Sequence, residues 1–268
     1  MNRFKKRTLL SFTGKCPINC KHCYTYELDT NVNIRDLDEI EIIMNSLKET
    51  IDSDIYYISR YRENFIDEKA GLMLTEQIYN TFHKPIFIIT RKCLNDQTIE
   101  QLNLLNKKMK ENHCFLTIAV SISADRSYDI IEDKSSIDSP SKRCQLIKKL
   151  NQNNIFTILM ARPVLPNRIL PVSEIINLIH QNSEYIDSVV ASGLAVNNQI
   201  LKRLNLQESD FSYLPGDNSE YLIGSGAKDI QYINVERELH MIQTSCSDLN
   251  LPFFTHSMNA LNLLNEKA

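Results

Sequence analysis

Short apolar runs alternate with amphipathic stretches along most of the chain. Runs rich in β-branched and aromatic residues predict strands, because such side chains suit a buried pleated surface. They occupy residues 8–12, 54–59, 85–90, 115–123, 155–161 and 188–192. The stretches between them carry apolar residues at helical spacing. They predict helices over residues 36–50, 72–82, 95–110, 140–151 and 172–181.

This alternation determines the expected fold class. Strands separated by helices pair in parallel through helical crossovers, so the sequence predicts an α/β fold. A closed (β/α)8 barrel and an open doubly wound sheet both fit the pattern. Beyond about residue 200 the alternation weakens to loops around one strand over 209–226 and a helix over 234–247. We therefore expect a domain over 1–200 and a C-terminal extension, 201–268, packed on it.

Composition narrows the class of protein. The chain has 268 residues, of which 43% are hydrophobic and 24% charged, as in globular proteins that bury a full core. Its net charge of -3 and its few, scattered basic clusters disfavour nucleic acid as a partner. No apolar run approaches the ~20 residues of a membrane span, and the N-terminal run is far shorter than the apolar region of a secretory signal, so we expect a cytoplasmic protein. Cysteines are reduced there, which favours metal or redox chemistry over disulfides.

Three of the seven cysteines lie close together directly after the first predicted strand, in Cys16-Pro-Ile-Asn-Cys20-Lys-His-Cys23. Loops at the C-terminal ends of strands form the ligand sites of α/β proteins. Three thiolates can hold three irons of a cubane cluster and leave the fourth open to a small molecule. The alternative is a zinc site, whose closed form needs four ligands. His22 is the candidate fourth ligand, but it adjoins Cys23 and converges poorly with it.

The spacing Cys-x3-Cys-x2-Cys, with His22 before and Tyr24 after the third cysteine, resembles the signature of the radical S-adenosylmethionine superfamily. The resemblance implies a partial (β/α)6 TIM-type barrel, in agreement with the six predicted strands. It also implies a [4Fe-4S] cluster on Cys16, Cys20 and Cys23, whose open iron binds S-adenosyl-L-methionine. Reductive cleavage then gives methionine and a 5′-deoxyadenosyl radical that abstracts hydrogen from a substrate. His22 and Tyr24 would contact the cofactor.

Over residues 7–170 the chain is most similar to spore photoproduct lyase-like members of that superfamily. The similarity lies in the segments Thr90-Arg91-Lys92, Val120-Ser121-Ile122-Ser123 and Ser139-Pro140-Ser141-Lys142-Arg143. It implies that Ser121 contacts S-adenosyl-L-methionine. It further implies that Arg91 or Lys92 lies near the carboxylate or ribose of the cofactor, where a cation pairs well with a carboxylate.

The chain also departs from the family pattern. Where many members have Gly-Gly-Glu after the second strand, it reads Ser59-Arg60-Tyr61-Arg62-Glu63-Asn64. We expect Glu63 to accept the cofactor's ammonium group, as a carboxylate does well. The hydrogen-donating cysteine of spore photoproduct lyase is missing near this strand end, so the sequence does not predict thymine-dimer repair. Arg162, after the fifth strand, is expected at the same end, where it would bind the cofactor or an anionic substrate.

The resulting hypothesis is a radical S-adenosylmethionine enzyme. It would draw electrons from an external one-electron reductant of the flavodoxin or ferredoxin type. Its substrate would be a peptide, a nucleotide or a small metabolite. The rival hypothesis is a non-catalytic iron–sulfur sensor or a degenerate S-adenosylmethionine-binding module, which the altered segment 59–64 keeps open.

Overall fold

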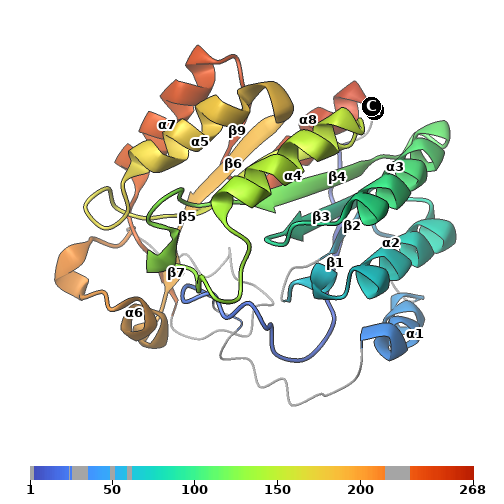
Figure 1. The fold of residues 1–268 in the computed structure, drawn as a ribbon, viewed down its shortest axis with the longest axis horizontal. Coiled ribbons are helices and arrows are strands. Elements are labelled where there is room, and N and C mark those ends of the chain that lie inside the picture. The colour runs from blue at the N-terminus through green and yellow to red at the C-terminus, as the bar shows by residue number, and fades with distance from the viewer. Residues whose placement is uncertain (1–2, 24, 26–35, 49–51, 59–61, 215–229) are drawn as a thin grey trace.

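A computed structural model describes residues 3–23, 25, 36–48, 52–58, 62–214 and 230–268. Its centre is a seven-stranded sheet in which every neighbouring pair of strands is parallel (Figure 1). In spatial order the strands are β1 (Arg7–Leu10), β2 (Ile55–Ile58), β3 (Ile86–Thr90), β4 (Leu116–Ser121), β5 (Phe156–Val164), β6 (Ser188–Gly193) and β9 (Phe253–Phe254).

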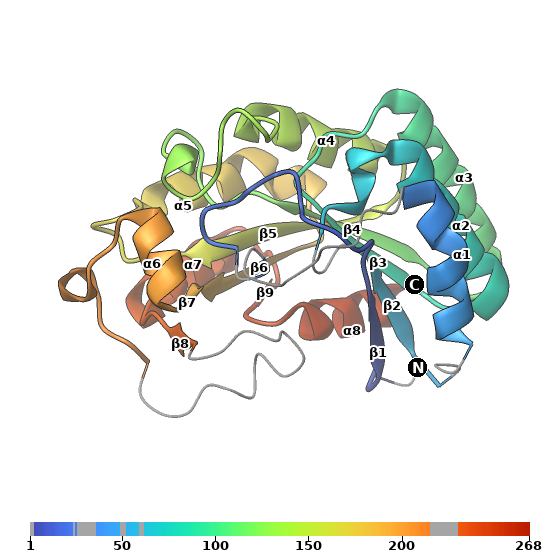
Figure 2. The same cartoon turned by 90° about the horizontal axis from the view of Figure 1, so that it is seen from below.

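Helices connect successive strands and cover one face of this sheet (Figures 1 and 2). They are α1 (Asp36–Leu47), α2 (Glu68–Phe82), α3 (Asp96–Glu111), α4 (Pro140–Gln152) and α5 (Val172–Asn182). Their starts follow local sequence signals. Asn95 caps α3 by accepting from the Thr98 amide at 2.8 Å. Pro140 opens α4, where its missing N–H leaves no bond unmade.

The predicted α/β class and the parallel sheet are confirmed, and each predicted strand and helix up to residue 193 is present within a few residues of its expected bounds. The later part of the chain adds α6 (Asn198–Leu204), α7 (Glu236–Asp248) and α8 (Ser257–Lys267). It also adds an antiparallel pair, β7 (Ala195–Val196) with β8 (Gln231–Tyr232). The C-terminal residues are thus part of the same architecture, because β9 extends the sheet beside β6.

Side chains alternate between the two faces of the sheet. On β4, Ile118 and Val120 belong to the core shared with the helix layer, whereas Ala119 belongs to a second core on the opposite, inner face. Helix α8 lies on that inner face (Figure 2), where Leu261 and Leu264 join the second core. Because the alternation continues to the strand ends, residues two positions beyond an inner apolar residue also face inward.

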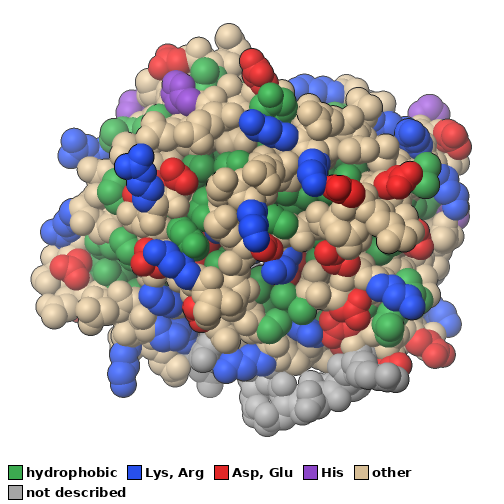
Figure 3. Space-filling model, viewed as in Figure 1, with side chains coloured by type: hydrophobic (Ala, Val, Ile, Leu, Met, Phe, Trp, Pro, Cys, Tyr) green, Lys and Arg blue, Asp and Glu red, His purple; other side chains and the backbone are tan. Residues whose placement is uncertain are grey.

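The surface over the helix layer mixes acidic and basic side chains (Figure 3). One example is the ion pair between Lys149 Nζ and Asp96 Oδ1 at 2.5 Å, which links α4 to α3. Within the described ranges, no helix combines the length and the apolar character needed to cross a membrane.

Candidate metal centre and cofactor site

The loop with the three cysteines, residues 13–23, follows β1. Its thiols gather in one small cluster with Ile18 and Ile137; Cys20 is buried, and Cys16 and Cys23 are partly exposed. Asn19, between the first two cysteines, has a φ of 53°, a left-handed conformation that asparagine tolerates. This turn brings Cys20 back beside Cys16.

The entrance to this loop is fixed by α1. Glu39, a buried residue of that helix, accepts two contacts from the amide of Thr13, at 2.8 and 3.0 Å. Arg62 donates to the carbonyl oxygen of Thr13 at 3.0 Å and forms an ion pair with Asp36 at 2.6 Å. Both backbone groups of Thr13 are therefore held by charged side chains.

The connection between β4 and α4, residues 122–139, holds one side of the cysteine loop. The carbonyl oxygen of Ile131 accepts from the Lys21 amide and from His22 Nδ1, each at 3.0 Å. The hydroxyl of Ser136 donates to the carbonyl oxygen of Ile18. Because Nδ1 of His22 is a donor, Nε2 is the acceptor nitrogen of that ring. Burial lowers the pKa of His22 to about 4, so the imidazole is neutral near pH 7.

Helix α6 holds the other side. Arg203 Nε donates to the carbonyl oxygen of Lys21 at 3.0 Å, and its Nη2 donates to that of Cys23 at 2.6 Å. Two neighbouring carbonyl groups of the loop are thus bound by one guanidinium. The loop is therefore positioned by contacts with residues that lie far from it in the sequence.

The surroundings of the thiols combine burial with positive charge. Burial raises the pKa of Cys20 to about 12, and the nearby Arg91 opposes that rise. Burial also raises the pKa of Cys16, against which the amides of Glu63 and Ile18 donate to its sulfur. The bound thiolates of a metal centre are stabilised by such cations and amide donors.

Arg91 is the centre of a buried polar network. Its Nη2 lies 3.4 Å from His22 Nε2, and its Nε lies 3.4 Å from Glu132 Oε1. Glu132 in turn forms a bidentate pair with Arg143, at 2.6 and 3.2 Å. Arg143 Nη1 donates to the carbonyl oxygen of Ser121 at 2.6 Å. The network therefore links the cysteine loop to the end of β4.

Glu63 bridges the ends of β2 and β3. Its carboxylate accepts from the Arg91 amide at 2.7 Å, from Thr90 Oγ1 at 3.1 Å and from the Phe65 amide at 3.2 Å. Burial raises its pKa, and these donors oppose the rise. A carboxylate has about four acceptor positions, so three donors leave room for one more. The backbone of Glu63 lies beside the Cys16 sulfur.

The remaining predicted site residues occupy distinct places. Lys92 forms an ion pair with Asp138 at 2.9 Å, so Arg91 is the basic residue beside the thiols. Ser121 Oγ is fully buried at the end of β4 and has no hydrogen-bond partner among the described residues. Tyr24 lies outside the described residues, as do Ser59, Arg60 and Tyr61.

Arg162 lies near the end of β5, and its backbone and its side chain contact different groups. Its carbonyl oxygen accepts from the Ser123 hydroxyl and, at 3.4 Å, from Arg91 Nη2. Its side chain turns toward α8, where Nη2 donates to the carbonyl oxygen of Thr255. Burial lowers the pKa of Arg162 to about 10.

The three thiols are grouped in one loop, and cysteine thiolates are the ligands of iron–sulfur clusters. Among the residues that the structure describes, no group of three or more His, Cys, Asp or Glu side chains surrounds a common metal position. A cubane cluster places each thiolate on a different iron, so its cysteine ligands surround the cluster and are not directed at one metal ion. The half-buried guanidinium of Arg91 and the amides at Cys16 would offset the negative charge of such a group.

Two residues of the site escaped the sequence analysis. Glu132 begins the polar run that ends at Ser136, which has the composition of an exposed loop, although the Glu132 side chain is buried. Arg203 lies where the strand–helix rhythm has weakened. Neither carries a local sequence signal for its role.

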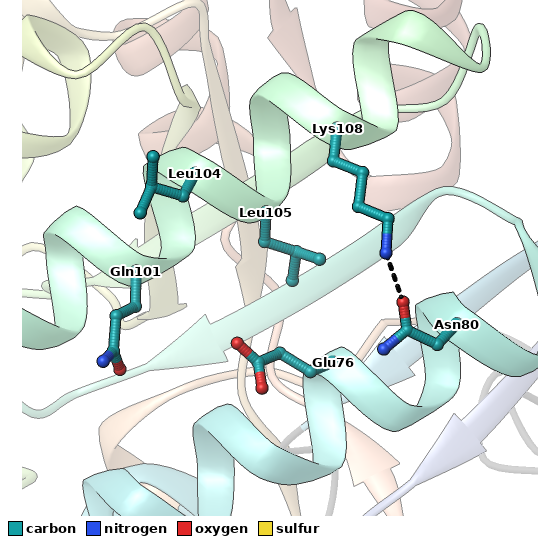
Figure 4. Close-up of a pocket in the computed structure, with 6 residues that line it drawn as sticks. All are labelled: Glu76, Asn80, Gln101, Leu104, Leu105 and Lys108. Atoms are coloured by element: carbon teal, nitrogen blue, oxygen red, sulfur yellow. Dashed lines mark hydrogen bonds between the residues drawn. The ribbon is translucent and has the colours of Figure 1, made fainter.

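A groove of about 350 Å³ lies elsewhere, between α2 and α3 (Figure 4). Its lining includes the exposed Leu104 and a hydrogen bond of 2.8 Å from Lys108 Nζ to Asn80 Oδ1. It belongs to the helix layer and shares no residue with the cysteine loop.

Comparison with known proteins shows the fold. No protein-family model matches the sequence, and no curated protein does. A spore photoproduct lyase mutant superposes with a TM-score of 0.63 at 9% identity, covering 96% of this chain and 79% of its own. A second mutant, with bound AdoMet and dinucleoside spore photoproduct, gives 0.62 at 9%, covering 92% and 76%. The lyase complexed with dinucleoside spore photoproduct gives 0.62 at 10%, covering 90% and 74%.

At these identities the likeness is one of fold. It confirms the expected α/β architecture of the partial-barrel type, and it agrees with the superfamily resemblance that the cysteine motif carries.

Proposed function

We propose that this chain is a radical S-adenosylmethionine enzyme whose Cys16, Cys20 and Cys23 hold a [4Fe-4S] cluster. The observation that carries the proposal is the grouping of the three thiols in one loop at the C-terminal end of β1, beside the half-buried Arg91. The fold shared with spore photoproduct lyase supports it. Reductive cleavage of S-adenosyl-L-methionine at the cluster is the chemistry that the bound cofactors supply, yielding methionine and a 5′-deoxyadenosyl radical for hydrogen abstraction from the substrate.

The protein's own residues bind and orient. Arg91 keeps a positive charge beside the thiolates and, in our proposal, takes the carboxylate-binding role that the sequence left between Arg91 and Lys92. Glu63 has an acceptor position left for an ammonium group. The unpartnered hydroxyl of Ser121 supports a ligand contact, since buried polar groups ordinarily have partners.

Three further contacts are part of the proposal. His22, held neutral by burial, presents Nε2 next to Arg91 and fixes the orientation of that guanidinium. Tyr24 completes the proposed cofactor contacts, and Arg162 is left between the cofactor and an anionic substrate. The electron comes from an external reductant of the flavodoxin or ferredoxin type, and the substrate is a peptide, nucleotide or small metabolite.

The test is anaerobic reconstitution with iron and sulfide, followed by reduction in the presence of S-adenosyl-L-methionine. We expect about four irons per chain, as a cubane requires, and formation of 5′-deoxyadenosine measured by liquid chromatography. Cys20→Ala should lose bound iron and all deoxyadenosine above background. Cys246→Ala is the matched control, because Cys246 is a buried thiol of α7 outside the cysteine loop.

Two outcomes would contradict the proposal. A loaded wild-type protein that forms no more deoxyadenosine than Cys20→Ala would favour the non-catalytic iron–sulfur module. A single zinc ion with complete coordination and no visible-region charge-transfer absorbance would favour the zinc site.

A further inference from the structure

Two arginines meet a tyrosine on the inner face of the sheet. The guanidinium carbon of Arg7 lies 5.3 Å from the ring centroid of Tyr57. The Tyr57 hydroxyl lies 3.5 Å from Ser257 Oγ, at the start of α8. Arg162 reaches the same place through its hydrogen bond to the carbonyl oxygen of Thr255. Strands β1, β2 and β5 and the first turn of α8 therefore converge here.

The charges of these two arginines have no carboxylate partner in the part of the chain that the structure describes. Neither Arg7 nor Arg162 forms an ion pair with a carboxylate of the described residues. The Nε atom of Arg162 is fully buried and has no hydrogen-bond partner there. Burial lowers the pKa of the neighbouring His256, and both arginines lower it further. Arg7 is exposed and Arg162 is half-buried, so only the Nε group of Arg162 is shielded from solvent, and a buried polar group without a partner favours a ligand beside it.

The end of α8 that lies here is the positive end of the helix dipole. The helix spans 11 residues from Ser257, its N-cap residue His256 makes no side-chain capping bond, and its first turn contains no acidic residue. The first amides of a helix and its dipole both favour an anion. Arg7, Thr255 and His256 are exposed, so a ligand can enter from solvent.

From the unpaired arginines and the uncapped helix we propose that an oxyanion of the substrate, a phosphate or carboxylate group, binds between Arg162, Arg7 and the N-terminus of α8. That the ligand is a substrate rests on the proposed function. The carbonyl oxygen of Arg162 contacts Arg91 beside the thiols, while its side chain reaches α8. An oxyanion held at the end of that side chain orients the rest of the substrate toward the cofactor.

The experiment is isothermal titration of the full-length, cluster-loaded protein with inorganic phosphate and, separately, with acetate. We expect saturable binding of the anion whose chemistry the substrate shares. Arg162→Gln should weaken it about tenfold or more, because a hydrogen bond to a charged group contributes about 1.5–3 kcal/mol. Arg7→Gln should weaken it about threefold, as expected of an exposed charge. Arg237→Gln, on the exposed surface of α7, is the matched control and should bind like wild type.

Three results would overturn the proposal. One is equal affinity of wild type and a folded Arg162→Gln for both anions. If that variant does not fold, unchanged affinity in Arg7→Gln decides the matter, since Arg7 is exposed. The third is displacement of the anion by S-adenosyl-L-methionine, which would assign the site to the cofactor. Anion binding requires no deoxyadenosine formation, so failure here and failure of the proposed function are separate results.

Discussion

Arg143 and Arg162 are both guanidinium groups near the C-terminal ends of the strands, but their surroundings differ in charge. Arg143 is fully buried and faces the buried carboxylate of Glu132 in a bidentate pair. Arg162 has a backbone carbonyl as its side-chain partner and a second arginine nearby. The first arrangement is complete within the fold, whereas the second leaves positive charge for a ligand. Arg143 therefore stabilises the fold, whereas the charge of Arg162 is available to bind an anion.

The ion pair between Arg143 and Glu132 also positions neighbouring elements. Glu132 contacts Arg143 of α4 and Arg91 after β3, so one carboxylate joins two elements and the loop between β4 and α4. The same loop holds the cysteine loop through Ile131. Around Arg162, by contrast, the neighbouring groups are Arg7 and the start of α8, which come from opposite ends of the chain and make few bonds with each other. This difference predicts unequal responses to substitution.

The largest effect is expected for Glu132→Gln. Removing this carboxylate leaves the buried guanidinium of Arg143 uncompensated, and breaking a buried pair in this way costs about 3–5 kcal/mol. The free energy of unfolding, measured by urea denaturation, should fall by that amount. Glu184→Gln, at an exposed position, should change it by less than about 0.5 kcal/mol. Equal stabilities for the two variants would remove the distinction between paired and unpaired arginines.

A smaller and pH-dependent effect is expected for Glu174→Gln. Oε2 of Glu174 accepts from the amides of Asp125, Arg126 and Ser127 at 2.8–3.0 Å, at the start of the loop that carries Glu132. Burial raises the pKa of Glu174, but the Ser127 hydroxyl and the three amides outweigh it and hold the pKa below its usual value. Loss of these bonds should cost about 1–2 kcal/mol at pH 7.

The pH dependence of that cost follows from the sign of the shift. A carboxyl group with a depressed folded pKa stabilises the protein above its unfolded pKa, about 4.3 for glutamate. This contribution is lost as the pH falls through the folded value. The stability difference between wild type and Glu174→Gln should therefore be greatest near neutral pH and shrink in acid. A difference that grows in acid would contradict this assignment.

The smallest effect on stability is expected for Arg162→Met. The substitution removes one hydrogen bond but also a half-buried charge that has no carboxylate partner among the described residues, and a methionine fills similar space. We expect the free energy of unfolding to change by less than about 1 kcal/mol. A loss as large as that of Glu132→Gln would show that Arg162 is an architectural residue after all.

The sequence predicts the fold well where the signals are local. Strand β3 and helix α4 carry their own patterns, down to Ser139 and Pro140 at the helix start. Helix α8 and strand β9 were missed for a physical reason. Strand β9 has two residues, and α8 is rich in asparagine and owes its burial to the inner face of the sheet. That face is formed by strands that are distant in sequence, so no short segment of the sequence indicates it.

The same limit applies to the site. The three cysteines form a local motif and were found at once. Adjacent residues Arg91 and Lys92 look alike in sequence, but one lies beside the thiols and the other pairs with Asp138. The convergence of Arg7 with Arg162 and the start of α8 depends on tertiary packing alone, since these residues are far apart in the chain.

The two hydrogen bonds from Arg203 to the cysteine loop span 182 and 180 residues of sequence. During synthesis the three cysteines leave the ribosome early. Arg203 can bind the loop only after α6 has been translated and has packed in place. The contacts from Glu39, Ile131 and Ser136 involve residues that are made earlier, so a shorter chain would hold the loop only in part. A chain that ended before α6 would carry every cysteine of the motif and would still lack these two hydrogen bonds to the loop.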